Sequence, residues 1–105
     1  MLLRDDDDIL PDAASDLERA FVDSLDADER RAVESRILSA AQRHWLKAAR
    51  VVWDAIDASD YDVWDASVVH AHVRALAGLV GAGELESRGD LRRPRFSEVC
   101  LPPHA

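Results

Sequence analysis

The alternation of apolar and polar residues in the first quarter of the chain predicts an amphipathic helix. Ser15 and Glu18 have the spacing of a capping box, a motif that begins a helix. Three apolar residues would line one face of this helix, namely Leu17, Phe21 and Leu25. A second start signal at residues 26–29 indicates that the helix ends near Leu25.

The segment from residue 27 to residue 57 contains no glycine or proline and could form one long helix. Its apolar residues nevertheless fall into two stripes, which are rotated by about 100° relative to each other. The first stripe consists of Val33, Ile37, Ala40 and His44. The second consists of Leu38, Trp45, Ala49, Val52 and Ile56. A break at residues 39–44 would reconcile them, leaving a second helix that Trp45 and Trp53 anchor in the core.

A last helix and a hairpin follow an acidic turn at residues 58–65. Asp65 can cap this helix, and the glycines after Val80 can end it, since glycine accepts the left-handed conformation of helix C-termini. Residues 84–86 and 96–101 would form the two strands of a hairpin. The pattern therefore predicts a mainly α (α+β) domain. Its four helices and C-terminal two-stranded β-hairpin follow one another in a winged-helix-like order.

Length and charge divide this chain into an arm and a domain. The 105 residues have room for one domain, because single domains commonly have about 100–150 residues. The first 30 residues hold eleven acids and three bases, including the run Asp5 to Asp8. We therefore predict a disordered acidic arm at residues 1–11 and a single folded domain at residues 12–105. The formal net charge of −8 argues against non-specific binding to nucleic acid.

Signals for secretion and membrane insertion are missing from the sequence. The N-terminus has no apolar leader segment, and no apolar stretch approaches the roughly 20 residues that a membrane helix needs. Cys100 is the single cysteine, which suits a reducing compartment. We expect a cytoplasmic protein that makes no contact with membranes.

Residue types that carry catalysis or bind metals do not occur at productive spacings. His70 and His72 would diverge by about 200° on a helix, whereas a helical zinc pair needs residues four apart. The aspartates of residues 54–65 lack the glycine and the glutamate of a calcium loop. We therefore predict that the protein is not an enzyme and that it binds no cofactor and no metal ion. A small enzyme would require a concave site that gathers His44, His70 or His72 with a carboxylate.

The outer face of the last helix is the first candidate for an interaction. The core stripe of this helix would consist of Val69, Val73, Leu76 and Val80. The opposite side would present Ala71, Arg74, Ala75 and Gly78. Small apolar residues suit close approach of a partner, so we predict a non-enzymatic protein–protein interaction module that binds a protein or forms a homodimer. Coverage of residues 71–78 by residues 12–25 of the same chain would remove the main support for this prediction.

Four arginines around the predicted hairpin support an alternative function. They are Arg88, Arg92, Arg93 and Arg95. On a winged helix such a loop can lie along the phosphate backbone. Of the preceding helix face, however, only Arg74 has a side chain that can pair with base edges. The alternative is a winged-helix nucleic-acid-binding regulator in which the acidic arm, residues 1–11, screens the arginines.

Short motifs in the last two thirds of the chain are similar to those of a known family. They comprise Trp45 and residues 50–52, 74–76, 83–86, 89–90 and 98–102. Over roughly residues 30–102 the chain resembles an uncharacterised bacterial domain of unknown function that often follows another uncharacterised domain. The resemblance implies a helical domain with a C-terminal hairpin and implies no activity or site residues.

Overall fold

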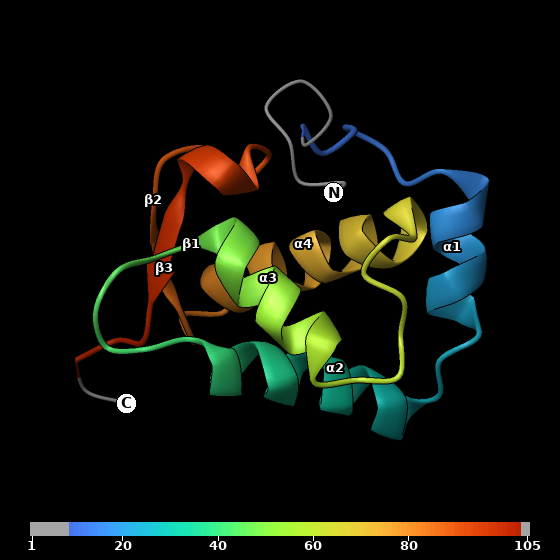
Figure 1. Cartoon of the computed structure of the whole chain (residues 1–105), viewed down its shortest axis with the longest axis horizontal. Coiled ribbons are helices and arrows are strands. Elements are labelled where there is room, and N and C mark those ends of the chain that lie inside the picture. The colour runs from blue at the N-terminus through green and yellow to red at the C-terminus, as the bar shows by residue number, and fades with distance from the viewer. Residues whose placement is uncertain (1–8, 104–105) are drawn as a thin grey trace.

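The computed structural model describes residues 9–103, within which there are four α-helices, one 3-10 helix and three β-strands (Figure 1). In chain order these are α1 (Asp16–Asp23), α2 (Ala27–Ala40), β1 (Leu46–Lys47), α3 (Ala48–Asp57), α4 (Ala66–Gly81), β2 (Glu86–Arg88), η1 (Pro94–Phe96) and β3 (Glu98–Cys100). The predicted class, mainly α with a small β part, is confirmed. None of the helices in this described part is long and apolar enough to cross a membrane.

The helices begin at the residues that the sequence indicates. The Ser15 hydroxyl accepts a hydrogen bond from the backbone N–H of Glu18 at 3.1 Å, and the Asp26 carboxylate accepts one from that of Glu29 at 2.8 Å. The side chain of Asp65 caps α4 in the same way. These bonds satisfy backbone donors that the first turn of a helix leaves without partners.

The predicted break in the long helical segment is confirmed and lies between Ala40 and Ala48. His44 is exposed in this connection, so its placement on the stripe of α2 was wrong. Trp45 and Trp53 are half-buried and lie outside the core, which corrects their predicted role as anchors. Trp45 lies in the break between the two helices, so the helical periodicity used to predict its burial does not apply to it.

The sheet has three antiparallel strands in the order β1–β3–β2, so the predicted two-stranded hairpin was incomplete. Val99 of the central strand is opposite Leu46 on one side and Ser87 on the other. The helices and strands follow one another as predicted, but the winged-helix likeness itself stays a prediction. β1 was missed because its two residues lie inside a segment that the hydrophobic pattern assigns to a helix.

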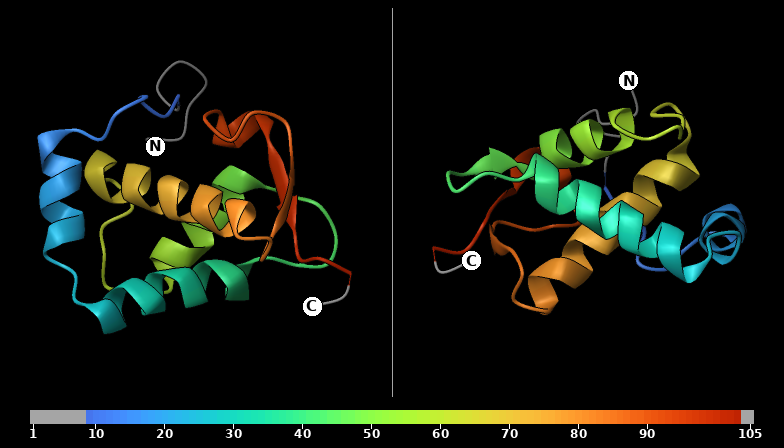
Figure 2. Two further views of the ribbon diagram at one scale, coloured as in Figure 1. Left: turned by 180° about the vertical axis from the view of Figure 1, so that it is seen from behind. Right: turned by 90° about the horizontal axis from the view of Figure 1, so that it is seen from below.

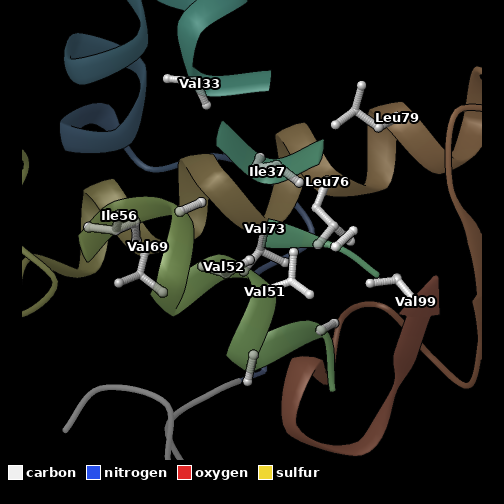
Figure 3. Packing of buried hydrophobic residues seen from close by; sticks show 14 of the residues in the cluster. Val33, Ile37, Val51, Val52, Ile56, Val69, Val73, Leu76, Leu79 and Val99 are labelled. Atoms are coloured by element: carbon white, nitrogen blue, oxygen red, sulfur yellow. The ribbon is translucent and has the colours of Figure 1, made fainter. Parts of the chain in front are cut away.

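The core lies where α2, α3 and α4 meet one another and the sheet (Figure 3). Its most deeply buried aliphatic side chains include Ile37, Val51, Val52, Ile56, Leu76, Leu79 and Val99. Figure 2 shows α1 lying across the N-terminal end of α4, while the strands lie near the other end of this helix. α4 therefore has its inner face on the core and its outer face partly under α1.

The predicted acidic arm lies mostly outside the described residues, and this includes Asp5 to Asp8. Leu10 is described and buried in the core, and its backbone N–H donates a hydrogen bond of 2.7 Å to the carbonyl of Arg92. The packed part of the chain therefore begins at least at Leu10, before the predicted domain boundary at residue 12.

Two glycines with left-handed backbone give a matched test of the hairpin. Gly83 has φ 80° with no atom near the position of a Cβ, whereas at Gly89, with φ 86°, a Cβ would lie 3.0 Å from the carbonyl oxygen of Phe96. We expect Gly83→Ala to lower the free energy of unfolding by about 1 kcal/mol and Gly89→Ala by about 2 kcal/mol or more. Urea denaturation measures both losses. Equal losses would contradict the close approach at Gly89.

Candidate functional site

The predicted interaction face of α4 is covered at one end and open at the other. Ala71 is buried and Ala75 is half-buried beside α1, whereas Gly78 is exposed with no atom within 4 Å of the position of a Cβ. Residues 12–25 thus cover part of the face, which weakens the interaction hypothesis in its original form. What remains is a half-covered surface with a boundary between Ala75 and Gly78.

A groove with a volume of about 520 Å³ lies beside this face, between α1, α2 and α4. We call it the α1–α2–α4 groove. Its apolar lining consists of Ala14, Phe21, Val22, Leu25, Val33, Ala71 and Ala75. Four exposed charged residues also line it, namely Arg19, Asp23, Arg30 and Glu34. The groove has the size of pockets that bind small ligands or single side chains, about 300–1,000 Å³.

An ion pair between a half-buried arginine and a buried glutamate joins α1 to α4 at this groove. Glu18 is 2% exposed, and its Oε2 accepts a hydrogen bond of 2.7 Å from Nε of Arg74. Nη2 of Arg74 donates a second bond, of 2.6 Å, to the backbone carbonyl of Pro11. Oε1 of Glu18 is buried without a hydrogen-bond partner. Arg74, a predicted site residue, therefore holds the N-terminal segment against α4.

His72 of α4 also contacts α1, through the ring of Phe21, and is fully buried. Its Nδ1 is 2.7 Å from the carbonyl oxygen of Val68, which can only accept, so Nδ1 carries the proton. Nε2 is then an acceptor, and it has no partner. The ring packs between Phe21 and Tyr61, with centroid distances of 6.4 and 5.9 Å. His72 therefore occupies a buried position against α1.

The surroundings of His72 keep its ring neutral. Burial lowers the pKa of His72 below its usual value of 6.5, the bond to Val68 raises it by a smaller amount, and the nearby Arg36 guanidinium lowers it again. The pKa of His70 is also lowered by burial, against the opposing carboxylate of Glu18. Both histidines thus bind a proton more readily in the unfolded chain.

Acidification is therefore expected to destabilise the fold before the carboxylates titrate. Below about pH 6.5 His72 becomes protonated in the unfolded state but stays neutral in the folded state, because its pKa is lower there. The free energy of unfolding therefore falls as the pH falls. The slope for His72 is at most about 1.4 kcal/mol per pH unit. Urea denaturation between pH 7 and pH 5 measures it. A slope that is unchanged in His72→Gln would contradict this assignment.

The groove brings His72 together with the carboxylate of Glu18, the combination on which the enzymatic hypothesis depends. Both side chains are buried, and no serine, threonine, cysteine or lysine is among the residues that line the groove. The lining of the groove therefore presents no hydroxyl, thiol or amine that could act as a nucleophile. Across residues 9–103, no three or more His, Cys, Asp or Glu side chains are placed to hold a metal ion.

Two of the four predicted arginines, Arg88 and Arg92, pair with the chain's own acids. Nε of Arg88 is 2.9 Å from Oε1 of Glu98, and its guanidinium lies 4.3 Å from the centroid of the Trp45 ring. Arg92 pairs with Asp90 at 3.1 Å and with Asp12 at 3.3 Å. The hydrogen bond from Arg92 holds the pKa of Asp90 below its usual value. All four predicted arginines, including Arg93 and Arg95, are exposed.

Sequence reasoning missed the groove and the role of Glu18. The capping-box spacing assigned Glu18 to its own helix, but the carboxylate contacts a residue 56 positions away. A glutamate on the apolar side of an amphipathic helix was the one available signal. Its side chain lies between Phe21 and Val22 around the helix, which indicates a buried partner of opposite charge.

Comparison of the chain with protein-family models, with curated proteins and with solved structures gave no match. The resemblance to a bacterial domain of unknown function therefore stays a prediction. The case for a function rests on the face of α4 and the groove beside it.

Proposed function

We propose that this chain is a non-enzymatic protein–protein interaction module that binds a helical segment of a partner protein on the outer face of α4. The observation that carries the proposal is the half-covered face, with Ala71 under α1 and Gly78 open. Apolar side chains of the partner would enter the α1–α2–α4 groove, whose floor includes Ala75.

The shape of the site favours a helical occupant over a small molecule. Ala71, Ala75 and Gly78 form one stripe along α4, and small residues in such a stripe let the backbone of a second helix approach closely. The groove continues this stripe sideways with apolar walls. A partner helix would therefore bury one apolar side in the groove and extend along α4 toward Gly78.

Filling the face without unfolding the domain tests the proposal. Helical peptides selected from a displayed library on the wild-type chain provide the probe, and fluorescence anisotropy gives their affinities. Ala75→Leu should weaken the selected peptides at least about tenfold, since the added carbons occupy the groove. Gly78→Leu should do the same while it favours the helix itself, because leucine has the higher helix propensity.

Ala20→Leu is the matched control, because Ala20 is exposed on α1 and does not line the groove. It should leave the affinity unchanged within about twofold. Failure to select any peptide that is sensitive to both face variants would contradict the proposal. Light scattering on the same proteins tests the homodimer. A dimer that Gly78→Leu dissociates would make a second copy the occupant and would overturn the assignment to a different protein.

Nucleic-acid binding is the second candidate, favoured by the hairpin that follows α3 and α4 and carries arginines. Binding would require release of Arg92 from Asp12. Removal of residues 1–8, combined with Asp12→Asn, leaves the buried Leu10 in place and removes five acids. This variant should bind duplex DNA at low salt, with affinity that falls steeply as salt rises. No binding at low salt would dispose of this candidate.

A further inference from the structure

α1 shows what kind of partner the face of α4 accepts, because this helix already occupies part of it. α1 presents Glu18 to Arg74, and its Phe21 ring lies 5.1 Å from the Tyr61 ring in an edge-to-face contact and stacks on His72 at 6.4 Å. Glu18 and Phe21 are three residues apart and therefore lie on one side of the helix. The face thus recognises a carboxylate and an aromatic ring on neighbouring turns of a helix.

α1 is held in this place by contacts that are incompletely satisfied. Two buried polar atoms at this contact have no hydrogen-bond partner in the protein, Oε1 of Glu18 and Nε2 of His72, and Nη1 of Arg36, which lies over the neighbouring Tyr61 ring, is a third. Each offsets part of the stabilisation that packing provides. α1 has eight residues, fewer than the roughly 12–15 that an isolated helix needs. Its Leu17 is 73% exposed. Such an element belongs to the part of a fold that opens most easily.

We propose that α1 is an exchangeable occupant of the α4 face, and that the partner is an acidic amphipathic helix that takes its place. The partner helix would present a carboxylate to Arg74 and an aromatic ring to His72 and Tyr61, as α1 does. This inference rests on the proposed function and deepens it, since it names the chemistry of the partner. The partner helix would keep the α2 and α4 side of the groove, which includes Val33, Ala71 and Ala75, and its own side chains would replace those of α1 that line the other side. α1 then competes with the partner, and any change that loosens α1 raises the partner's affinity.

A synthetic peptide of residues 12–26, blocked at both ends, is the probe for exchange in the full-length chain. Phe21→Ala in the chain removes the ring contacts of α1 and leaves Ala71 and Arg74 unchanged. This variant should bind the peptide at least about tenfold more tightly than the wild-type chain, in which the attached α1 has the advantage of high effective concentration. Circular dichroism shows whether Phe21→Ala is folded. Glu18→Gln, which weakens the contact of α1 with Arg74, is the second loosened variant and is used alone if Phe21→Ala does not fold.

An exchange of charges then tests whether Arg74 binds the Glu18 carboxylate of the peptide. Arg74→Glu in the chain should abolish binding of the natural peptide and restore it for a peptide that carries Glu18→Arg. Absence of peptide binding to both loosened variants, or binding that ignores the charge at Arg74, would overturn the inference. If Ala75→Leu and Gly78→Leu abolish binding of selected peptides but Phe21→Ala does not strengthen it, the face is the binding site and the exchange is wrong.

Discussion

Replacing Arg74 with methionine is expected to weaken the docking of α1 on α4 by about 3 kcal/mol. The Glu18 carboxylate is 2% exposed and Arg74 is its one ion-pair partner within residues 9–103, so the variant leaves a buried charge without compensation. Methionine keeps most of the apolar stem of arginine, which limits the loss of packing. Amide hydrogen exchange in α1 measures the effect, which corresponds to exchange about a hundredfold faster than in the wild type.

The double variant Glu18→Met, Arg74→Met provides the control for this prediction. Removal of both charges leaves no buried ion, so docking should return to within about 1 kcal/mol of the wild type. The same double variant removes the orphaned Oε1 atom. Exchange in α1 that stays within about threefold of the wild type after Arg74→Met alone would show that the ion pair does not hold the helix.

Leu76→Ala is expected to lower the free energy of unfolding of the whole domain by about 3–4 kcal/mol. Leu76 is fully buried on the inner face of α4, where α2 and α3 pack (Figure 3). The variant loses the transfer free energy of the side chain and leaves a cavity, because close-packed neighbours relax only in part. Urea denaturation followed by circular dichroism measures the loss.

Leu17→Ala is the matched surface control, since the same chemical change is made at a residue that is 73% exposed. Its effect should stay within about 0.5 kcal/mol. A loss below about 1 kcal/mol for Leu76→Ala would mean that α4 does not have its inner face in the core as described. The two leucines thus separate the core of the domain from the exposed side of α1.

Local signals in the sequence predict the helices well. The capping residues Ser15, Asp26 and Asp65 each bond to a backbone N–H within their own first turn, so a short stretch of sequence is enough to place a helix start. The shift of the apolar stripe correctly indicates a break before α3, because periodicity is a local property of the chain. The same logic places the inner face of α4 on Leu76 and its neighbours.

Contacts between distant segments escaped prediction. A hydrophobic pattern tells which side of a helix is buried but not which element covers it, so the position of α1 on α4 was open. The pairs Glu18 with Arg74 and Asp12 with Arg92 join residues 56 and 80 positions apart. β1 likewise exists only through its pairing with β3. The candidate site is made of such contacts, which explains why the face of α4 was predicted and the groove was not.

The shortness of the edge strands restricts how a partner can dock. β1 has two residues and β2 has three, so neither outer edge of the sheet offers a long row of backbone donors and acceptors. An incoming strand needs such a row to extend a sheet, and short edges are one means by which proteins prevent aggregation through strand addition. The edges of this sheet are therefore poorly suited to strand addition, which agrees with the proposal that a partner binds on a helical surface.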